Sequence, residues 1–417
     1  MIINLAPTSC PANPIDVHHP FRLLRLTPLL ALAATFIPRL AAAEAPLASV
    51  IDSALATSAK QYEWMLAHLP AEAAKPLPRT FEHGKLSTIS TQDWTSGFFP
   101  GSMWYLFEAT GDAKWRASAE KFTAYLEPEQ FNTKTHDVGF MLFCSYGNGL
   151  RLTGNAAYRP ILLNGAKSLS TRFNPTVAAI KSWDHGVGTF TYPVIIDNMM
   201  NLELMFWAAR EGPAERYRDL SLRHADTTLK NHYRPDGSSF HVVDYDPADG
   251  HVIKRVTHQG AADDSAWARG QAWGLYGYTV MYRETKDPRY LTHAQKIAAF
   301  IMHHPRLPAD KVPYWDFDAP GIPNVSRDAS AAAIMCSALL ELRTFVPAAA
   351  ASEYTTFAEE QLRSLASPAY LAEPGTNGGF LLMHSTGHHP KDSEIDVPIN
   401  YADYYFLEAL LRARKKV

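Results

Sequence analysis

The sequence contains little cysteine and little charge. Three of its 417 residues are cysteines, and charged side chains make up 19% of the chain, with 39 basic against 42 acidic residues and a formal net charge of −3. No stripe of basic residues stands out, which argues against nucleic acid as a partner. Cys144 and Cys336 lie in apolar helical patterns, so we predict buried free thiols and no bridge between them.

Metal-binding patterns are also lacking. No cysteines or histidines have the spacing of a zinc site. The adjacent pairs His303-His304 and His388-His389 do not have the four-residue spacing that places two imidazoles on one helix face. We therefore expect neither a metal nor a cofactor.

The apolar run at residues 26–37 is too short to span a bilayer. It follows Arg22 and Arg25 and precedes three alanines at 41–43, an order typical of an export signal. We therefore expect residues 1–43 to be a leader and residues 44–417 to form a single catalytic domain. The mature protein would then be exported, to the periplasm or out of the cell. A net charge this close to zero leaves the number of subunits open.

Aromatic residues are abundant. The chain has nine tryptophans and nineteen tyrosines, and hydrophobic residues make up 47% of it, enough for a sizeable core. Trp94 and Trp183 lie in loop or helix-start contexts, where an indole can stack on a sugar ring. Core packing is the commoner role of tryptophan, and composition alone does not distinguish a tryptophan in the core from one that stacks on a sugar.

A weak repeat runs through the chain. Six segments each place an aspartate at or near the start of a run of small, apolar and aromatic residues, as expected of a helix packed on several sides. These aspartates are Asp93, Asp137, Asp197, Asp264, Asp328 and Asp403. Amphipathic segments, with apolar residues at steps of three and four, lie between them. They are residues 47–68, 112–126, 156–171, 213–231, 287–303 and 350–366.

Helices that alternate in this way predict an all-α fold. An inner ring of six helices covered by an outer ring of six, an (α/α)6 barrel, satisfies both patterns. An α-solenoid is the alternative, but its repeat length would be steadier. If the inner helices are parallel, the six aspartates lie near one mouth of the barrel. Residues 240–245 and 252–256 flank Asp249-Gly250 and predict one small β-hairpin insertion.

Two of the aspartates have unusual neighbours. Asp137 follows His136, and Asp197 follows the apolar string PVII. Burial of Asp197 beside a second carboxylate would raise its pKa and keep it protonated near neutrality. A protonated carboxyl group facing an ionised one is the pattern of glycoside hydrolysis. The alternative is that both aspartates are helix N-caps.

A second group of polar residues surrounds Arg269. Trp273 follows Arg269 by one helical turn, so both side chains share a helix face. A buried arginine needs an anion, and Asp263, Asp264 or a ligand carboxylate would provide one. The arginine is therefore either part of a ligand site or a lock on the helix start.

Three strings carry a resemblance to a known family. HDVGF, YPVIIDNMMN and DDSAWARGQAWGLYG resemble the unsaturated glucuronyl hydrolases, family 88 of the glycoside hydrolases, and the similarity extends from about Trp64 to Tyr405. The resemblance implies an (α/α)6 barrel, which the helix pattern also predicts. It implies that Asp137 and Asp197 form the catalytic pair. The substrate-binding residues that it implies are Trp94, His136, Trp183, His241, Gln259, Arg269 and Trp273.

The resemblance also implies a reaction. The substrate would be the 4,5-unsaturated uronic acid that polysaccharide lyases leave at the non-reducing end of oligosaccharides, of glycosaminoglycan type. Asp197 would protonate C4 and then accept a proton from the water that adds to C5. Asp137 would bind the ring hydroxyls and stabilise the developing positive charge. The resulting hemiketal would open the ring and release the remaining saccharide.

Three other functions compete with this one. An unsaturated rhamnogalacturonyl hydrolase of family 105 would act on pectin fragments, but the string DDSAWARGQAWG and the spacing of His241 and Gln259 favour family 88. A non-catalytic periplasmic glycan-binding barrel would not need both carboxylates. An epimerase would want two histidine bases, and only His241 is clearly placed.

Overall fold

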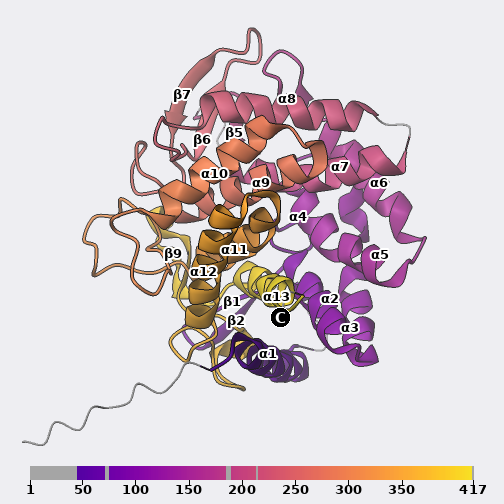
Figure 1. The fold of residues 1–417 in the computed structure, drawn as a ribbon. Helices are drawn as coiled ribbons and strands as arrows, with labels where there is room; N and C mark the ends of the chain where they lie inside the picture. The colour runs from indigo at the N-terminus through magenta and orange to yellow at the C-terminus, as the bar shows by residue number, and fades with distance from the viewer. Residues whose placement is uncertain (1–44, 71–74, 185–188, 213–214, 416–417) are drawn as a thin grey trace, which may run out of the picture. The chain divides into compact units, whose positions relative to one another are not determined.

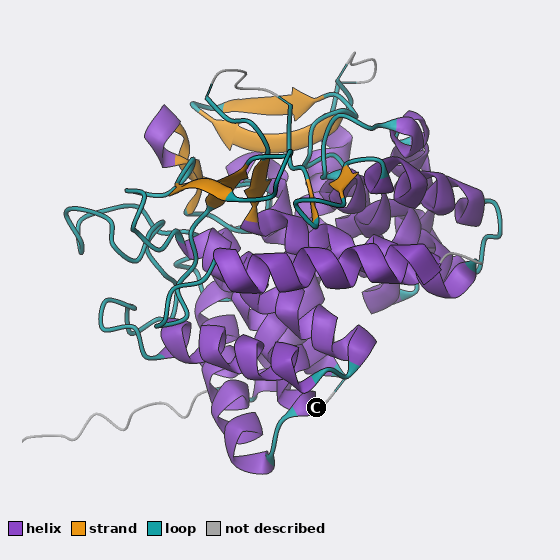
Figure 2. Cartoon of the chain, turned by 90° about the horizontal axis from the view of Figure 1, so that it is seen from above, coloured by secondary structure: helices purple, strands orange, loops and turns teal. Residues whose placement is uncertain are grey.

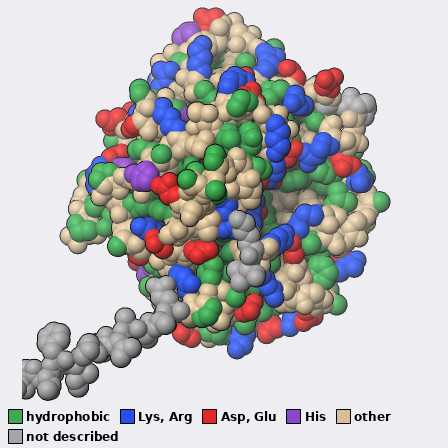
Figure 3. Space-filling model, in the orientation of Figure 1, with side chains coloured by type: hydrophobic (Ala, Val, Ile, Leu, Met, Phe, Trp, Pro, Cys, Tyr) green, Lys and Arg blue, Asp and Glu red, His purple; other side chains and the backbone are tan. Residues whose placement is uncertain are grey.

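The computed structural model describes residues 45–70, 75–184, 189–212 and 215–415. The predicted leader, residues 1–43, lies outside the described residues. Within the described part of the chain, no helix combines the length and hydrophobicity that a membrane span requires. On the face drawn in Figure 3, lysines and arginines are interspersed with aspartates and glutamates.

Amphipathic helices form the outer ring of a barrel, and they follow the predicted segments closely (Figure 1). They are α1 (Leu47–His68), α3 (Ala113–Ala124), α6 (Tyr158–Ser170), α8 (Glu215–Asn231), α10 (Pro288–Met302) and α12 (Ala348–Leu365). Each packs its apolar face onto an inner helix and leaves its charged face to solvent. The periodicity of the sequence therefore located the whole outer layer.

The inner ring consists of helices that are buried on nearly every side. They are α2 (Phe98–Thr110), α4 (Val138–Leu142) continued by α5 (Asn148–Thr153), α7 (Leu202–Glu211), α9 (Ala268–Thr285), α11 (Ala329–Leu342) and α13 (Asn400–Arg414). Neighbours contact in the order α2, α13, α11, α9, α7, α4 and, through its continuation α5, back to α2, so the ring is closed. This closure confirms the (α/α)6 barrel and excludes an open solenoid.

Short turns with left-handed residues connect the paired helices. Gly111, at φ 68°, ends α2, and Asp112 then accepts the Lys114 N–H at 3.0 Å to begin α3. Lys286, at φ 58°, ends α9 in the same conformation, and Asp287 begins α10. A side chain that accepts the first free N–H groups stabilises a helix start by about 1 kcal/mol.

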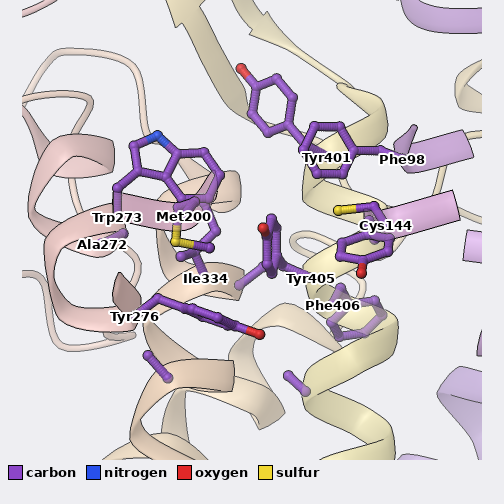
Figure 4. Packing of buried hydrophobic residues seen from close by; sticks show 14 of the residues in the cluster. Phe98, Cys144, Met200, Ala272, Trp273, Tyr276, Ile334, Tyr401, Tyr405 and Phe406 are labelled. Carbon is purple, nitrogen blue, oxygen red and sulfur yellow. The ribbon is translucent and has the colours of Figure 1, made fainter. Parts of the chain in front are cut away.

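Aromatic side chains from different inner helices fill the middle of the barrel (Figure 4). The Trp273 ring on α9 lies 5.2 Å from the ring of Phe140 on α4 and 5.4 Å from that of Tyr405 on α13, centroid to centroid. Each large aromatic side chain buries roughly 150–250 Å². Cys144 and Cys336 lie buried in this core as free thiols, which confirms that prediction.

The strands gather at one end of the helices (Figure 2). They are β1 (Leu77–Glu82) with β2 (Lys85–Ile89); β3 (Phe173–Asn174) with β4 (Ala179–Ile180); β5 (Pro193–Ile195) with β6 (Val242–Tyr245) and β7 (Val252–Val256); and β8 (Ser385–His388) with β9 (Ser393–Val397). The predicted β6–β7 hairpin is confirmed, but the expectation of a single hairpin was wrong. β3, β4 and β5 have only two or three residues each, too few for an alternation to be recognised in the sequence.

Candidate active site

A pocket of about 250 Å³ is lined by residues of β1, β5, β8 and β9, and so lies at the end of the barrel where the strands gather. It is lined by Arg79, Trp94, Lys134, Thr135, His136, Asp137, Trp183, Ile195, Asp197, His258, Gln259, Gly387, His388, Glu394 and Tyr401. Asp137, Asp197 and Tyr401 come from the N-terminal ends of three different inner helical segments. The predicted parallel arrangement thus brings both candidate catalytic carboxylates into one pocket.

Strand pairing places Asp197 beside His241. β5 leads directly into a 3₁₀ turn that contains Asp197, and the pairing of Ile195 with Val242 brings the residue before β6 alongside. The His241 Nε2 atom lies 3.6 Å from Asp197 Oδ2. His241 Nδ1 accepts the backbone N–H groups of His258 and Gln259, each at 3.1 Å. In the neutral ring the proton is therefore on Nε2, facing the carboxyl group.

Burial sets the protonation of both groups. The Asp197 side chain belongs to a residue that is only 6% exposed, and burial raises its pKa to about 6. Asp137 raises this pKa further, while His136 and Arg269 oppose the rise. Burial also lowers the pKa of His241 well below its usual value, so its ring stays neutral. Asp197 can therefore hold a proton in weakly acidic solution and release it within the ordinary pH range.

Asp137 is held by its own chain neighbours. Its Oδ2 accepts the Thr135 hydroxyl at 2.5 Å, and its Oδ1 lies 3.1 Å from His136 Nε2. No backbone N–H of α4 donates to it, so the N-cap alternative does not describe its side chain. The carboxylate accepts the Thr135 hydroxyl, lies within ion-pair distance of His136 and remains open to the pocket, as a group that binds hydroxyls requires.

The two aspartate segments are packed tightly against each other. The Phe140 N–H donates to Asn201 Oδ1 at 2.9 Å. A Cβ atom at Gly139 would lie 2.7 Å from Asn201 Cα, so only glycine fits there. The distance between the carboxylates is thus set by backbone packing, which is stiffer than side-chain contact.

Arg269 is buried behind the pocket wall and is 1% exposed. Its Nη1 donates to Asp328 Oδ2 at 2.8 Å and to the Thr386 carbonyl at 2.5 Å, and its Nη2 donates to the Gly387 carbonyl at 2.6 Å. Gly387 lines the pocket, and Gln259 Nε2 donates to the same carbonyl at 3.0 Å. Arg269 therefore holds β8 against α9 and α11. It is not one of the described residues that line the pocket.

The prediction that Asp263 or Asp264 pairs with Arg269 was wrong. Asp263 and Asp264 are exposed, because the chain remains in a loop until α9 begins at Ala268. For the same reason Asp264 is not at a helix start: the N-cap of α9 is Trp267. Asp328, which caps α11, takes the place of both as the partner of Arg269.

The predicted tryptophans have two different environments. Trp94 and Trp183 line the pocket, and Trp94 packs 5.1 Å from the ring of Tyr401. Trp273 is fully buried in the aromatic core and does not reach the pocket wall. Its position one turn from Arg269 on α9 places it below the pocket floor, where Phe140 and Tyr405 enclose it.

Several pocket residues carried no signal in the sequence. Arg79 on β1 donates to both Asp93 oxygens and to both Glu394 oxygens at 2.5–2.8 Å, and so joins the turn before α2 to the β8–β9 hairpin. Glu394 is 315 residues away from Arg79 along the chain. His388 stood out in the sequence only as one of an adjacent histidine pair; burial lowers its pKa to about 4. Such contacts depend on tertiary structure and have no local pattern.

A second, larger cavity lies at the opposite ends of the inner helices and has a volume of about 660 Å³. Its charged residues pair with one another, as Arg283 does with Glu203 and Arg412 with Glu408. It contains neither candidate catalytic aspartate. Three side chains at the tip of the β6–β7 hairpin are close enough to share a cation, but they lie outside the pocket as well; they are Asp246, Asp249 and His251.

No protein-family model matches the chain. Among curated proteins, an unsaturated glucuronyl hydrolase of Formosa agariphila is 48% identical over 330 residues, which cover 79% of this chain and 82% of that protein. An unsaturated chondroitin disaccharide hydrolase of Streptococcus pneumoniae is 32% identical over 345 residues, covering 82% and 86%.

Solved structures agree. The crystal structure of an unsaturated glucuronyl hydrolase specific for heparin superimposes with a TM-score of 0.84 at 48% identity, over 88% of this chain and 98% of that one. The glycosaminoglycan-degrading enzyme of Bacillus sp. superimposes with a TM-score of 0.81 at 28% identity, over 89% and 98%. With this similarity and two carboxylates in one pocket, the chain belongs to the unsaturated glucuronyl hydrolases, a family of glycoside hydrolases.

Proposed function

We propose that this enzyme removes 4,5-unsaturated uronic acid from the non-reducing end of lyase-generated oligosaccharides of glycosaminoglycan type. The observation that carries this proposal is the pairing of Asp197, buried and with a raised pKa, with Asp137 in the same pocket. The relatives named above act on glucuronyl, chondroitin or heparin substrates. These names favour glycosaminoglycan fragments over pectin fragments as the substrate class.

The reaction begins with proton transfer from Asp197 to C4 of the unsaturated ring. The C4=C5 bond is part of an enol ether, so protonation at C4 places positive charge on C5 and the ring oxygen. The ionised Asp197 then accepts a proton from water as the water oxygen bonds to C5. The hemiketal so formed opens the ring and releases the remaining saccharide, with one water consumed.

Residues in the pocket and behind its wall support this cycle. The Nε2–H of His241 points at Asp197 and stabilises its ionised form after the proton has left. Asp137 binds ring hydroxyls and stabilises the cationic ring, while His136 and Thr135 hold it in place. Trp94 and Trp183 offer aromatic faces to the sugars. Arg269 acts through β8, whose Gly387 carbonyl it fixes next to Gln259.

Ultraviolet absorbance of the conjugated double bond tests the reaction and the substrate class together. Purified enzyme is incubated with unsaturated disaccharides from chondroitin, hyaluronan, heparin, gellan and pectin. Loss of absorbance with the glycosaminoglycan substrates, and slower loss with the pectin substrate, is expected. Unchanged absorbance in every arm would contradict the proposed reaction and favour a glycan-binding protein.

We also propose that the enzyme is exported to the periplasm or beyond the cell. The support is the sequence of residues 1–43, in which Arg22 and Arg25 precede an apolar run and three alanines. Cell fractionation, with N-terminal sequencing of the mature protein, tests this. A cytoplasmic protein that retains residues 1–43 would contradict it.

A further inference from the structure

The second cavity, at the opposite ends of the inner helices from the catalytic pocket, has a rim where cations are more exposed than the carboxylates that pair with them. The Arg210 side chain is 54% exposed and its partner Glu284 12%, and Arg151 is 45% exposed and its partner Glu108 16%. Figure 3 shows a hollow on one face of the molecule, with lysine and arginine side chains around it. The cavity therefore presents positive charge at its mouth, although its residues form ion pairs.

The rim cations keep donors for a ligand. A guanidinium group has several N–H groups. Arg210 donates to Glu284 through Nη1, and Arg151 donates to Glu108 through Nη2 at 2.5 Å. The Lys415 ammonium lies 3.3 Å from the other oxygen of Glu108, so two cations share one carboxylate. An anion that enters at this corner therefore meets both N–H donors and an excess of positive charge.

Helix ends alone do not account for these cations. Arg151 and Arg210 lie in the last turns of α5 and α7, where a cation interacts favourably with the helix dipole. Arg159 lies in the first turn of α6, where the dipole disfavours a cation, yet it lines the same cavity and pairs with Glu211. Its position favours a role for the cavity lining itself.

One face of α7 adds acceptors and an aromatic ring to this lining. Glu203, Trp207 and Glu211 line the cavity and follow one another at steps of four residues, so they share a helix face. Carboxylates accept hydrogen bonds from hydroxyl groups, and the apolar C–H face of a sugar packs against an indole. The lining thus suits a ligand that combines hydroxyl groups, apolar faces and negative charge.

An acidic saccharide combines these three properties, whereas an inorganic anion has only the charge. The volume, about 660 Å³ against about 250 Å³ for the catalytic pocket, leaves room for more than one sugar ring. We propose that this cavity is a second, non-catalytic site that binds an acidic oligosaccharide, with its sulfate or carboxylate groups at the rim cations and its hydroxyl groups at the carboxylates of α7. This site goes beyond the proposed function, because it takes no part in the reaction.

Isothermal titration calorimetry tests the proposal with a sulfated tetrasaccharide that lacks the C4=C5 double bond and so is not consumed. The double variant Arg151→Gln, Arg210→Gln is expected to weaken binding at the second site roughly three- to tenfold, and high salt to weaken it in the wild type. The value of kcat/KM for an unsaturated disaccharide should not change. Glu108 keeps Lys415 as a partner and Glu284 keeps Arg283 at 3.0 Å, so neither carboxylate is left unpaired.

The double variant Arg116→Gln, Arg289→Gln is the matched control. It removes the same charge from two exposed arginines that line neither cavity, and it should bind the tetrasaccharide as the wild type does. Should the rim variant not fold, Lys415→Gln removes one exposed rim cation outside the core and should weaken binding roughly twofold.

Three results would overturn the proposal. They are equal affinity in the rim variants and the wild type, an equal loss of affinity in the control, and binding of inorganic sulfate as tight as that of the tetrasaccharide. The calorimetric result does not depend on turnover. An enzyme that consumes no unsaturated disaccharide would refute the proposed function and leave the test of this site intact.

Discussion

Replacement of Asp197 by asparagine separates activity from stability. The amide has nearly the same shape as the protonated carboxyl group but has no proton to give to C4. General acid–base groups contribute about 10²–10⁴-fold to rate, so we expect kcat to fall by that factor while KM changes little. The assay is loss of ultraviolet absorbance with an unsaturated disaccharide.

The same substitution is expected to stabilise the folded protein. Burial raises the pKa of Asp197 from its ordinary 3.8 to about 6, so ionising the group in the folded state costs about 3 kcal/mol. The protonated form is favoured in the fold, so this cost is absent below pH 4 and is fully present above about pH 6 to 7. Asparagine does not ionise, so the variant does not bear this cost at any pH.

Urea unfolding of both proteins at about pH 4 and at about pH 8 measures this difference. The free energies of unfolding should agree at the lower pH, and the variant should be more stable by up to about 3 kcal/mol at the higher pH. A variant that keeps kcat within tenfold of the wild type would refute the proton-donor role. Equal stability at both pH values would refute the burial argument, whatever the activity.

Three further predictions concern the pH profile and the support of the site. Because Asp197 must be protonated to donate, kcat/KM should decrease as the pH rises through about 6, which a pH–rate profile measures; a flat profile to pH 8 would contradict this. Arg269→Ala leaves Asp328 buried without its partner, so thermal unfolding should show a loss of about 3–5 kcal/mol as well as weaker substrate binding. Gly139→Ala forces the two aspartate segments apart, and a loss of about 1–3 kcal/mol with lower kcat is expected from urea unfolding and the absorbance assay.

The candidate residues differ in whether the sequence alone could predict their surroundings. The pair Asp137 and Asp197 was identified from sequence strings, and the structure brings both into one pocket. Arg269 was identified as a buried cation, but its partner Asp328 is 59 residues away and was not predicted. An ion pair needs only two complementary charges, and the local sequence does not say which of several aspartates is near.

Local sequence determined the helices of this barrel. Apolar residues at steps of three and four specify one buried face, and runs that are apolar on every side specify a helix enclosed by others. These patterns depend only on residues that are close in the chain, so they can be recognised in the sequence without knowledge of the tertiary structure. The order of the rings follows from them, because only a closed double layer buries both kinds of helix.

Tertiary structure alone decided the pocket. The neutral state of His241, the raised pKa of Asp197 and the bridge from Arg79 to Glu394 all depend on burial and on contacts between distant segments. Pairing between short strands brings those segments together. The free energy that sets protonation comes from the loss of water around a group, and that loss exists only once the chain has folded.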